Sequence, residues 1–355
     1  MKLFDRIKRR PLTKELAPSG IVSTGERLPK WNGDELIAKH GYAIYEKMSQ
    51  DAHVKACLNA KRYALLSVGW RIEAADKSIL AQRAARFCQD ALNQIEGGLR
   101  TVLWNALDAL SKGFSVQETI FAQSGSALVI RTTKAKDPSA FVFETDEFGN
   151  ILALRMTTPD GRTIDLPPEK FIVYPFGVKY ESPYGESDLK AAYKHWFAKD
   201  RLIRFWNVYL EKFATPTLIG TYQRGLPPQL QSELLEALER VQQETAIVTP
   251  EEVRIQALEI AQHGAGAYKE ALAFHNAEIS KSILGETLTV DEGRTVGSLA
   301  LGQVHMDALA AHLRSIRLDL ADRVAARQIL KPLIELNLPG APVPRFEWEE
   351  STRWT

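Results

Sequence analysis

Apolar residues recur at helical spacing through most of the first hundred residues of the chain. This pattern predicts helices over residues 33–66, with Asp34 capping the first turn, and over 78–95 and 99–113. Residues 68–75 alternate between apolar and polar and predict a strand. The N-terminal third is therefore expected to be mainly helical, with one short strand.

From residue 114 the pattern changes to short apolar runs separated by turn-forming residues. The predicted strands lie around Val116, around Ile120, and over residues 128–131, 141–143, 151–156 and 171–174. Turn signals at residues 146–150 and 159–161 separate several of them. The first half of the chain is therefore predicted to be an α+β module.

The second half is dominated by long helical patterns. The predicted order is a helix over 187–213, a strand over 217–221, a helix over 228–243, a strand pair over 246–249 and 253–257, a helix over 266–284, a glycine-punctuated loop over 285–297 and a very long helix over 298–336. Pro332 is expected to kink or end the last helix. Two long helices thus flank a small α/β insert.

Charge and composition exclude several classes of protein. The 355 residues are 45% hydrophobic and 25% charged, as in an ordinary globular protein, and their formal net charge is only +1. A protein dedicated to coating DNA would be strongly basic, so any DNA contact must come from local patches or from repetition in an oligomer. Because no apolar run approaches the roughly 18–20 residues that span a bilayer, we expect a soluble cytoplasmic protein without its own export route.

The sequence offers no catalytic or metal-binding constellation. Cys57 and Cys88 lie in helical patterns without metal-like spacing and are expected to be buried free thiols. His305 and His312 are seven residues apart, too far for the i, i+4 pair of a zinc helix. We therefore expect no enzyme activity, no cofactor and no bound metal.

A short motif stands at the head of the first long helix. Residues 184–189 read Tyr-Gly-Glu-Ser-Asp-Leu, and a strand containing Pro216 follows that helix. The motif resembles the Tyr-Gly-x-Ser-x-Leu signature of tailed-phage portal proteins, and the whole chain is similar to the portal family of phage Mu and related prophages. The family pattern falls on Tyr184, Gly185, Ser187, Leu189 and Pro216.

The resemblance implies an α+β portal fold with an α/β wing, a two-helix stem, a small α/β clip insert and a long C-terminal helix. The expected regions are an N-terminal arm (1–30), the first part of the wing (31–186), stem helix 1 (187–213), the clip (214–263), stem helix 2 (264–284), the tunnel loop (285–297), a long helix returning to the wing (298–337) and a C-terminal tail (338–355). Many relatives continue into a C-terminal crown, so the crown is expected to be short, absent or trimmed.

The resemblance also implies a function. Family members form a ring, dodecameric in the capsid, at one capsid vertex, and double-stranded DNA passes through it during packaging and ejection. The implied partners are further copies of the chain, DNA without sequence preference, the major capsid protein, the large terminase and a head-tail adaptor, with no membrane. The implied location is the virion, and the host cytoplasm during assembly. Two alternatives stay open, namely a metal-dependent DNA-processing enzyme and another head or neck adaptor.

The helix over 187–213 carries a basic stripe opposite an apolar side. The stripe consists of Lys190, Lys194, Arg201, Arg204 and Lys212, and the apolar side of Leu189, Ala192, Trp196, Ile203 and Leu210. In a ring the stripe could pair with acidic residues of a neighbour, remain solvated, or face DNA phosphates. The first two interpretations are favoured slightly over the third.

The loop over 285–297 carries three acids, Glu286, Asp291 and Glu292, and one arginine, Arg294, with Lys281 a few residues before it. A strongly basic loop would hold DNA and stall it, because each neutralised phosphate strengthens binding. We hypothesise that this loop narrows the channel and touches DNA lightly, with Arg294 as the main phosphate partner and Lys281 in the channel lining. A flexible connector and a solvated lysine are the alternatives.

Overall fold

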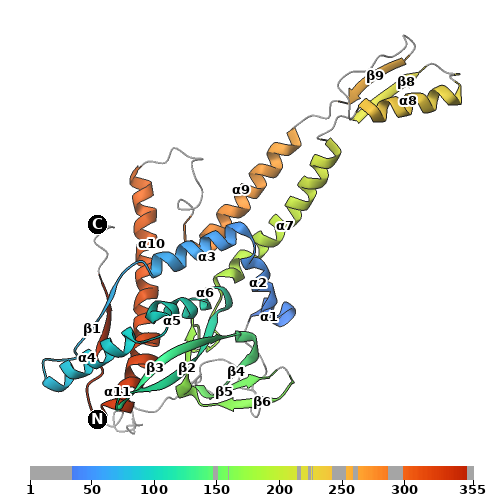
Figure 1. Cartoon of the computed structure of the whole chain (residues 1–355). Coiled ribbons are helices and arrows are strands. Elements are labelled where there is room, and N and C mark those ends of the chain that lie inside the picture. The colour runs from blue at the N-terminus through green and yellow to red at the C-terminus, as the bar shows by residue number, and fades with distance from the viewer. Residues whose placement is uncertain are drawn as a thin grey trace, which may run out of the picture. The chain divides into compact units, whose positions relative to one another are not determined.

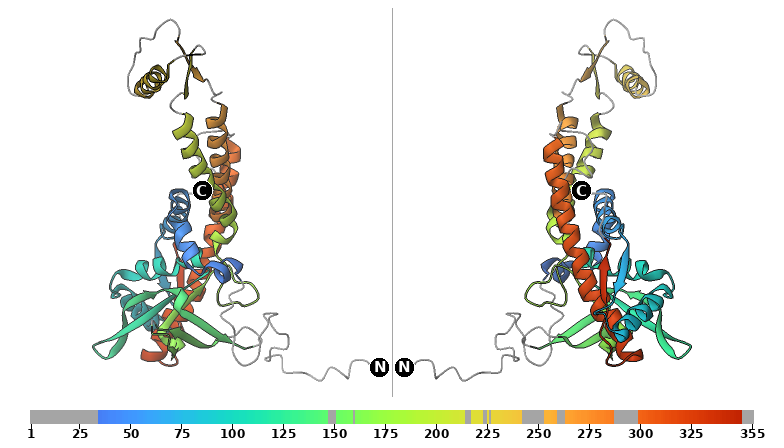
Figure 2. Two further views of the ribbon diagram at one scale, coloured as in Figure 1. Left: turned by 90° about the vertical axis from the view of Figure 1, so that its right-hand side faces the viewer. Right: turned by 90° about the vertical axis from the view of Figure 1, so that its left-hand side faces the viewer.

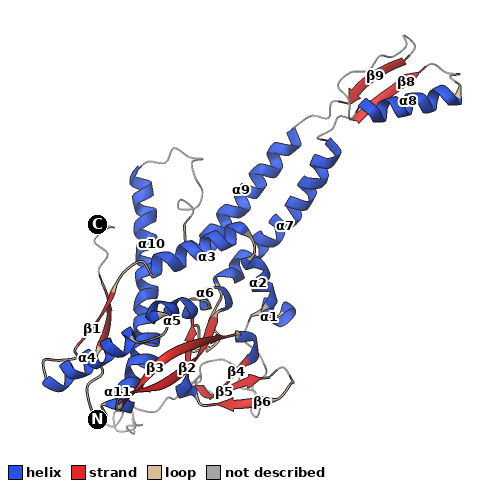
Figure 3. Cartoon of the chain, in the orientation of Figure 1, coloured by secondary structure: helices blue, strands red, loops and turns tan. Residues whose placement is uncertain are grey.

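The computed structural model describes residues 34–146, 151–158, 160–213, 217–222, 225, 227–241, 253–258, 263–286 and 299–349. The chain divides into two compact units: unit 1 comprises Met1–Tyr193 and Glu278–Thr355, and unit 2 comprises Lys194–Ala277. Helices and strands are mixed throughout unit 1 (Figure 3). This mixture confirms the predicted α+β class.

The helical pattern over 33–66 folds as three helices rather than one. They are α1 (Glu35–His40), α2 (Ala43–Ser49) and α3 (Ala52–Leu65). Asp34 caps α1 as predicted, by accepting a hydrogen bond from Leu36 N at 2.9 Å. Gly41 ends α1 at a φ of +67°, and Asp51 caps α3. Hydrophobic periodicity missed both breaks because it continues across them.

The first predicted strand pairs with the C-terminal end of the chain. β1 (Trp70–Glu73) runs antiparallel to β10 (Arg345–Trp348), a strand that was not predicted within the tail. The indole Nε1 of Trp348 donates to Arg317 O at 2.7 Å, and Trp70 stacks on Phe346 with ring centroids 5.7 Å apart. The C-terminal segment is therefore part of the packed structure of unit 1.

Three helices and two small sheets complete the first half of unit 1. The helices are α4 (Ile79–Asn93), α5 (Gly98–Ala106) and α6 (Ala109–Lys112), so the pattern over 99–113 is also broken. One sheet has the order β3-β2-β7, formed by Ala127–Lys136, Phe114–Ser124 and Phe171–Pro175. The other has the order β4-β5-β6, formed by Phe141–Thr145, Ile151–Thr157 and Thr163–Leu166. Single-turn 3₁₀ helices at Pro138–Ala140 and Pro168–Lys170 lead into β4 and β7.

An apolar cluster joins the two sheets. Its buried members come from β2, β4, β5 and β7 and are Phe114, Val116, Phe141, Phe143, Leu154 and Phe171. Both sheets lie at one end of unit 1, away from α3 (Figure 2). Since burial of such side chains is the main favourable term in folding, this cluster fixes the relative position of the sheets.

The last long helix runs through unit 1 and is continuous past Pro332. α10 (Leu299–Asp319) crosses α3 (Figure 1), then continues as a π-helix over Leu320–Leu330 and as α11 (Lys331–Asn337). The helix does not end at Pro332, so that part of the prediction is wrong. Pro332 stands in the first turn of α11, where a missing backbone N–H is tolerated.

Side-chain amides of this helix cover both edges of the β3-β2-β7 sheet. Gln328 accepts from Val173 N at 2.7 Å and donates to Val173 O at 2.8 Å, on β7. Asn337 accepts from Leu128 N at 2.7 Å and donates to Leu128 O at 2.9 Å, on β3. The helix thus satisfies edge groups that could otherwise pair with another strand.

Unit 2 is built on two long helices whose other ends belong to unit 1. These are α7 (Asp188–Phe213) and α9 (His263–Leu284), and the segment between them contains β8 (Thr217–Tyr222), α8 (Pro228–Val241) and β9 (Val253–Leu258). β9 pairs antiparallel with β8. The predicted strand over 246–249, its expected partner, lies outside the described residues. The helix, insert, helix order is confirmed.

Candidate functional site

The motif Tyr184–Leu189 forms the turn that leads into α7, and its glycine has no room for a side chain. Gly185 has a φ of +58°, and a Cβ there would lie 2.8 Å from Phe176 N and overlap the carbonyl oxygens of Phe176 and Gly113. The opposing Gly113 has a φ of +88°, and its Cβ would lie 2.5 Å from Tyr184 O. Backbone packs directly on backbone here, which only glycine permits.

Two backbone hydrogen bonds hold this close approach. Phe176 N donates to Gly113 O at 2.8 Å, and Glu186 N donates to Phe176 O at 2.7 Å. The Glu186 side chain points to Lys179, with 2.7 Å between Oε2 and Nζ, and both side chains are exposed. Of the two variable positions of the motif, Glu186 has a side chain that reaches solvent, whereas the side chain of Asp188 is largely buried.

Tyr184 connects the motif to the apolar cluster of the sheets. Its ring meets those of Phe114 and Phe143 edge-on, with centroids 5.5 Å and 5.1 Å apart. Its hydroxyl accepts a hydrogen bond from Phe143 N at 3.2 Å. Burial raises the pKa of Tyr184 above its usual range, so the phenol stays neutral.

Ser187 caps α7 and ties it to α6. Its Oγ accepts from Leu189 N at 3.0 Å and donates to Ser111 O at 2.6 Å. Leu189 itself is fully buried. The serine thus satisfies one otherwise unpaired N–H at the start of α7 and fixes where that helix begins.

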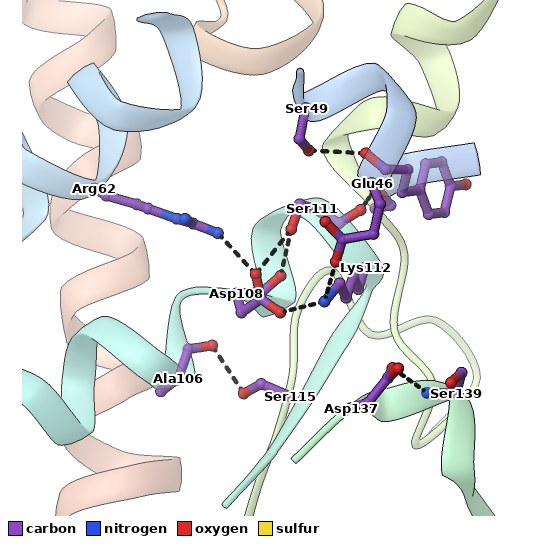
Figure 4. Close-up of polar contacts among 12 residues, drawn as sticks. Glu46, Ser49, Arg62, Ala106, Asp108, Ser111, Lys112, Ser115, Asp137 and Ser139 are labelled. Atoms are coloured by element: carbon purple, nitrogen blue, oxygen red, sulfur yellow. Dashed lines mark hydrogen bonds and ion pairs between the residues drawn. The ribbon is translucent and has the colours of Figure 1, made fainter. Parts of the chain in front are cut away.

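A charged network fixes α6 in turn (Figure 4). Asp108 accepts from Arg62 of α3 at 3.1 Å and from Lys112 at 3.0 Å, and Lys112 also contacts Glu46 of α2 at 2.6 Å. Burial alone would lower the pKa of Lys112, but the two carboxylates outweigh it and the pKa is raised. The Ser111 carbonyl that receives the Ser187 hydroxyl therefore belongs to a helix that α2 and α3 both hold in place.

A buried ion pair joins α3 to both long helices. Lys61 of α3 is fully buried, and its Nζ lies 2.7 Å from Asp188 Oδ2 at the start of α7 and 2.9 Å from Ile283 O near the end of α9. The ammonium also lies 5.2 Å from the centroid of the Phe176 ring. Burial raises the pKa of Asp188 to about 6, and the opposing charge of Lys61 limits the rise.

Further hydrogen bonds surround this pair. Ser282 Oγ donates to Asp188 O at 2.9 Å, and His53 Nε2 lies 2.8 Å from the buried Ser280 Oγ. We call Lys61, Asp188, Ile283, Ser282, Ser280 and His53 the root cluster. It fixes the last turn of α9, immediately before the predicted tunnel loop, against α3 and the start of α7.

The predicted basic stripe is mostly exposed. Lys190 is half-buried, and Lys194, Arg201 and Arg204 are exposed. The Arg201 guanidinium lies 4.2 Å above the Phe197 ring, and Arg204 pairs with Asp200 at 2.9 Å. The Lys212 side chain lies outside the described residues. On the opposite side Leu189, Ala192 and Trp196 are buried, whereas Ile203 and Leu210 are exposed.

The predicted tunnel-loop residues have different surroundings. Lys281 is exposed and pairs with Glu278 at 2.6 Å, and Glu286 is only 2% exposed. A side chain as buried as Glu286 does not line an open surface of this chain. Asp291, Glu292, Arg294 and Pro216 lie outside the described residues, so their roles stay predictions.

Neither thiol is positioned for chemistry. Cys57 and Cys88 are both buried and form no disulfide, as predicted. Burial raises the pKa of Cys88 to about 12, so this thiol stays protonated. Among the described residues, no three histidine, cysteine or acidic side chains gather as a metal site. In that part of the chain, no helix is both long and apolar enough to cross a bilayer.

Comparison with known proteins identifies relatives over nearly the whole chain. A family model described as the portal protein of Mu bacteriophage matches residues 42–353. The portal protein of Escherichia phage Mu is 24% identical over 330 residues, covering 92% of this chain and 63% of that protein. The Mu-like prophage FluMu protein gp29 of Haemophilus influenzae is 25% identical over 307 residues, covering 84% and 58%. The chain thus spans about three-fifths of the length of these relatives.

Solved structures share the fold at low sequence identity. A chain in the virion of a native gene transfer agent particle gives a TM-score of 0.66 at 12% identity, covering 92% of this chain and 88% of that chain. A chain in the neck of an empty particle of this kind gives 0.64 at 13% identity, covering 90% and 85%. Both likenesses concern the fold alone.

Proposed function

The chain belongs to the portal protein family of phage Mu, and we propose on this basis that it is one subunit of a phage portal. Copies of the chain form a closed ring at one capsid vertex, and double-stranded DNA enters and leaves through the ring. The observation that carries this proposal is the family match over residues 42–353. The fold shared with chains in the neck and in the virion of gene transfer agent particles supports it.

Exposed apolar side chains on the long helices also support a ring. In unit 2, Phe197, Ile203, Phe205, Val208 and Leu210 of α7 and Phe274 of α9 are each at least 37% exposed, and Phe205 reaches 62%. Large apolar side chains left exposed in this number on two long helices are normally covered by a partner. In a ring of identical subunits, that partner is the next copy of the chain.

The proposed division of labour follows the order of the elements. The long helices α7 and α9 form the stem, and residues 214–263 form the clip on which the large terminase and later the head-tail adaptor dock. Unit 1 contains the wing, which contacts the major capsid protein. The loop over 285–297 faces the DNA. The root cluster supports this reading, because it fixes the start of α7 and the end of α9 on the same helix, α3.

Electron microscopy of the purified full-length chain tests the proposal. We expect ring-shaped particles with a central hole, twelve-fold in the capsid, and binding of DNA without sequence preference. A chain that stays monomeric at every concentration and never forms a ring would refute the portal proposal. Cleavage of DNA with Mg²⁺ or Mn²⁺ would instead favour the DNA-processing alternative.

The role of the loop needs a separate experiment. We propose that Arg294 is its main phosphate contact, so Arg294→Ala should change the rate of DNA packaging or the retention of packaged DNA. Arg162→Ala is a suitable control, because Arg162 is an exposed arginine in the β5–β6 turn. Equal packaging and retention in both variants and in the parent protein would remove Arg294 from this role.

A further inference from the structure

Two histidines face each other between the long helices of unit 2. Nδ1 of His195 on α7 lies 3.1 Å from Nδ1 of His275 on α9, and the ring centroids are 5.4 Å apart with the planes inclined by 51°. Both rings are half-buried. No spacing within a single helix indicates this pair, because the two histidines lie 80 positions apart in the sequence.

The short distance restricts the protonation of the pair. Two N–H groups directed at each other at 3.1 Å would repel, so at least one Nδ1 presents its lone pair to the space between the rings. A neutral imidazole with an available lone pair is the form that binds a metal ion. The two nitrogens can therefore either form one hydrogen bond with each other or bind the same metal ion.

The separation of the nitrogens fits a shared metal ion. Zinc binds histidine nitrogen at about 2.0–2.1 Å, so two ligands on one tetrahedral ion lie about 3.3 Å apart, and two at a right angle about 2.9 Å apart. The observed 3.1 Å falls between these values. We propose that His195 and His275 bind one divalent transition-metal ion of the class that imidazole prefers, such as Zn²⁺ or Ni²⁺, through their Nδ1 atoms.

The surroundings define the character of this site. The Phe274 ring packs edge-on to both imidazoles, with centroids 6.0 Å from His195 and 5.3 Å from His275, and so restricts their rotation. Phe274 is 57% exposed, which places the pair close enough to the surface for water to complete the coordination.

Metal binding would join α7 to α9 at His195 and His275. An ion that binds the folded chain and not the unfolded one stabilises the fold in proportion to its concentration. The site therefore offers a reversible link between the two helices. The site consists of the two histidines and does not depend on the proposed function.

Titration of the tag-free full-length chain with Zn²⁺ tests the site. We compare the parent protein with His195→Gln, His275→Gln and the control His40→Gln, whose histidine is exposed on α1. Glutamine retains hydrogen-bonding capacity but is a poor ligand. Loss of an outer-shell partner alone weakens metal binding by about 10- to 100-fold, so loss of either direct ligand should weaken it at least tenfold. The control should bind one ion per chain, as the parent does.

Equal Zn²⁺ binding by all four proteins, or no saturable binding by the parent, would overturn the proposal. If a variant fails to fold, histidine-labelled NMR of the parent decides the matter. Zn²⁺ must then shift the Nδ1 signals of two histidine rings, and a chelator must reverse the shift. Unchanged Nδ1 signals would leave a simple hydrogen bond and refute the metal site.

Discussion

Gly185→Ala is the substitution that tests most directly how the motif works. The new methyl group would lie 2.8 Å from Phe176 N and overlap the carbonyl oxygens of Gly113 and Phe176. To make room, the turn must move away from the residues that flank β2 and β7, which breaks the hydrogen bond from Glu186 N to Phe176 O.

The expected cost combines two contributions. An L-residue in the left-handed region costs about 1–2 kcal/mol. Overpacking and the loss of the backbone hydrogen bond from Glu186 N to Phe176 O add about 2–3 kcal/mol. We therefore expect Gly185→Ala to lower the free energy of unfolding by about 3–5 kcal/mol, enough to reduce the yield of assembled particles.

A matched control separates the two contributions. Gly125, in the turn between β2 and β3, has a φ of +61°, close to the +58° of Gly185, but a Cβ there meets no atom within 4 Å. Gly125→Ala should therefore cost only the conformational part, about 1–2 kcal/mol. Urea unfolding at one fixed protein concentration measures both variants. Equal losses would show that the contact with Gly113 and Phe176 does not constrain the motif.

Three further substitutions address the start of α7. Ser187→Ala removes the cap of α7 and the hydrogen bond to Ser111 O, and should lower the free energy of unfolding in urea by about 1–3 kcal/mol. The control Ser67→Ala changes an exposed serine and should be nearly neutral. Equal losses in the two variants would contradict the capping role of Ser187. Lys61→Met leaves the Asp188 carboxylate buried without its counter-charge and should lower the free energy of unfolding by about 3–5 kcal/mol. Adding Asp188→Asn to this variant should restore most of the loss. If the losses of the two single variants simply add in the double variant, the two side chains are not coupled. Burial raises the pKa of Asp188 to about 6, so folding favours the protonated carboxyl. The stability that this carboxyl contributes is fully present below its pKa in the unfolded chain and is lost as the pH rises through about 6. The parent should therefore gain stability relative to Asp188→Asn as the pH falls from about 7 to 4, and parallel pH profiles would contradict the shift.

These predictions concern a structural connection rather than a catalytic centre. The motif, the α6 network and the root cluster all determine where α7 starts and α9 ends. Under the proposed function, those two points are where the stem would meet the wing and the tunnel loop. Loss of any one connection should therefore affect assembly and DNA passage together, through the position of the helices.

The elements with a clear hydrophobic pattern of their own were predicted from the sequence. The 26-residue α7, α9, the insert between them and most strands were predicted because periodicity and turn residues belong to the segment itself. The breaks within 33–66 and 99–113 were missed because the hydrophobic pattern continues through them. β10 was missed because its partner, β1, lies more than 270 residues away.

The candidate site also contains residues that the sequence identified and residues that it did not. Tyr184, Gly185, Ser187 and Leu189 were identified as a motif, although the sequence showed no reason for the glycine. Lys61 was not identified, because its partners lie 127 and 222 residues further along the chain. Its only local signal is its position among the buried Leu58 and Leu65 of α3, where a lysine is unusual.

The sequence by itself determined the class of fold, the order of the long helices and the family resemblance, since each rests on patterns within short segments. Only the tertiary structure decided why Gly185 must be glycine, which carboxylate neutralises Lys61, and that His195 meets His275. These facts depend on atoms brought within about 3 Å of each other from distant parts of the chain. Such contacts exist only once burial of the apolar cores has placed the helices and sheets together, because no local pattern records what lies across an interface.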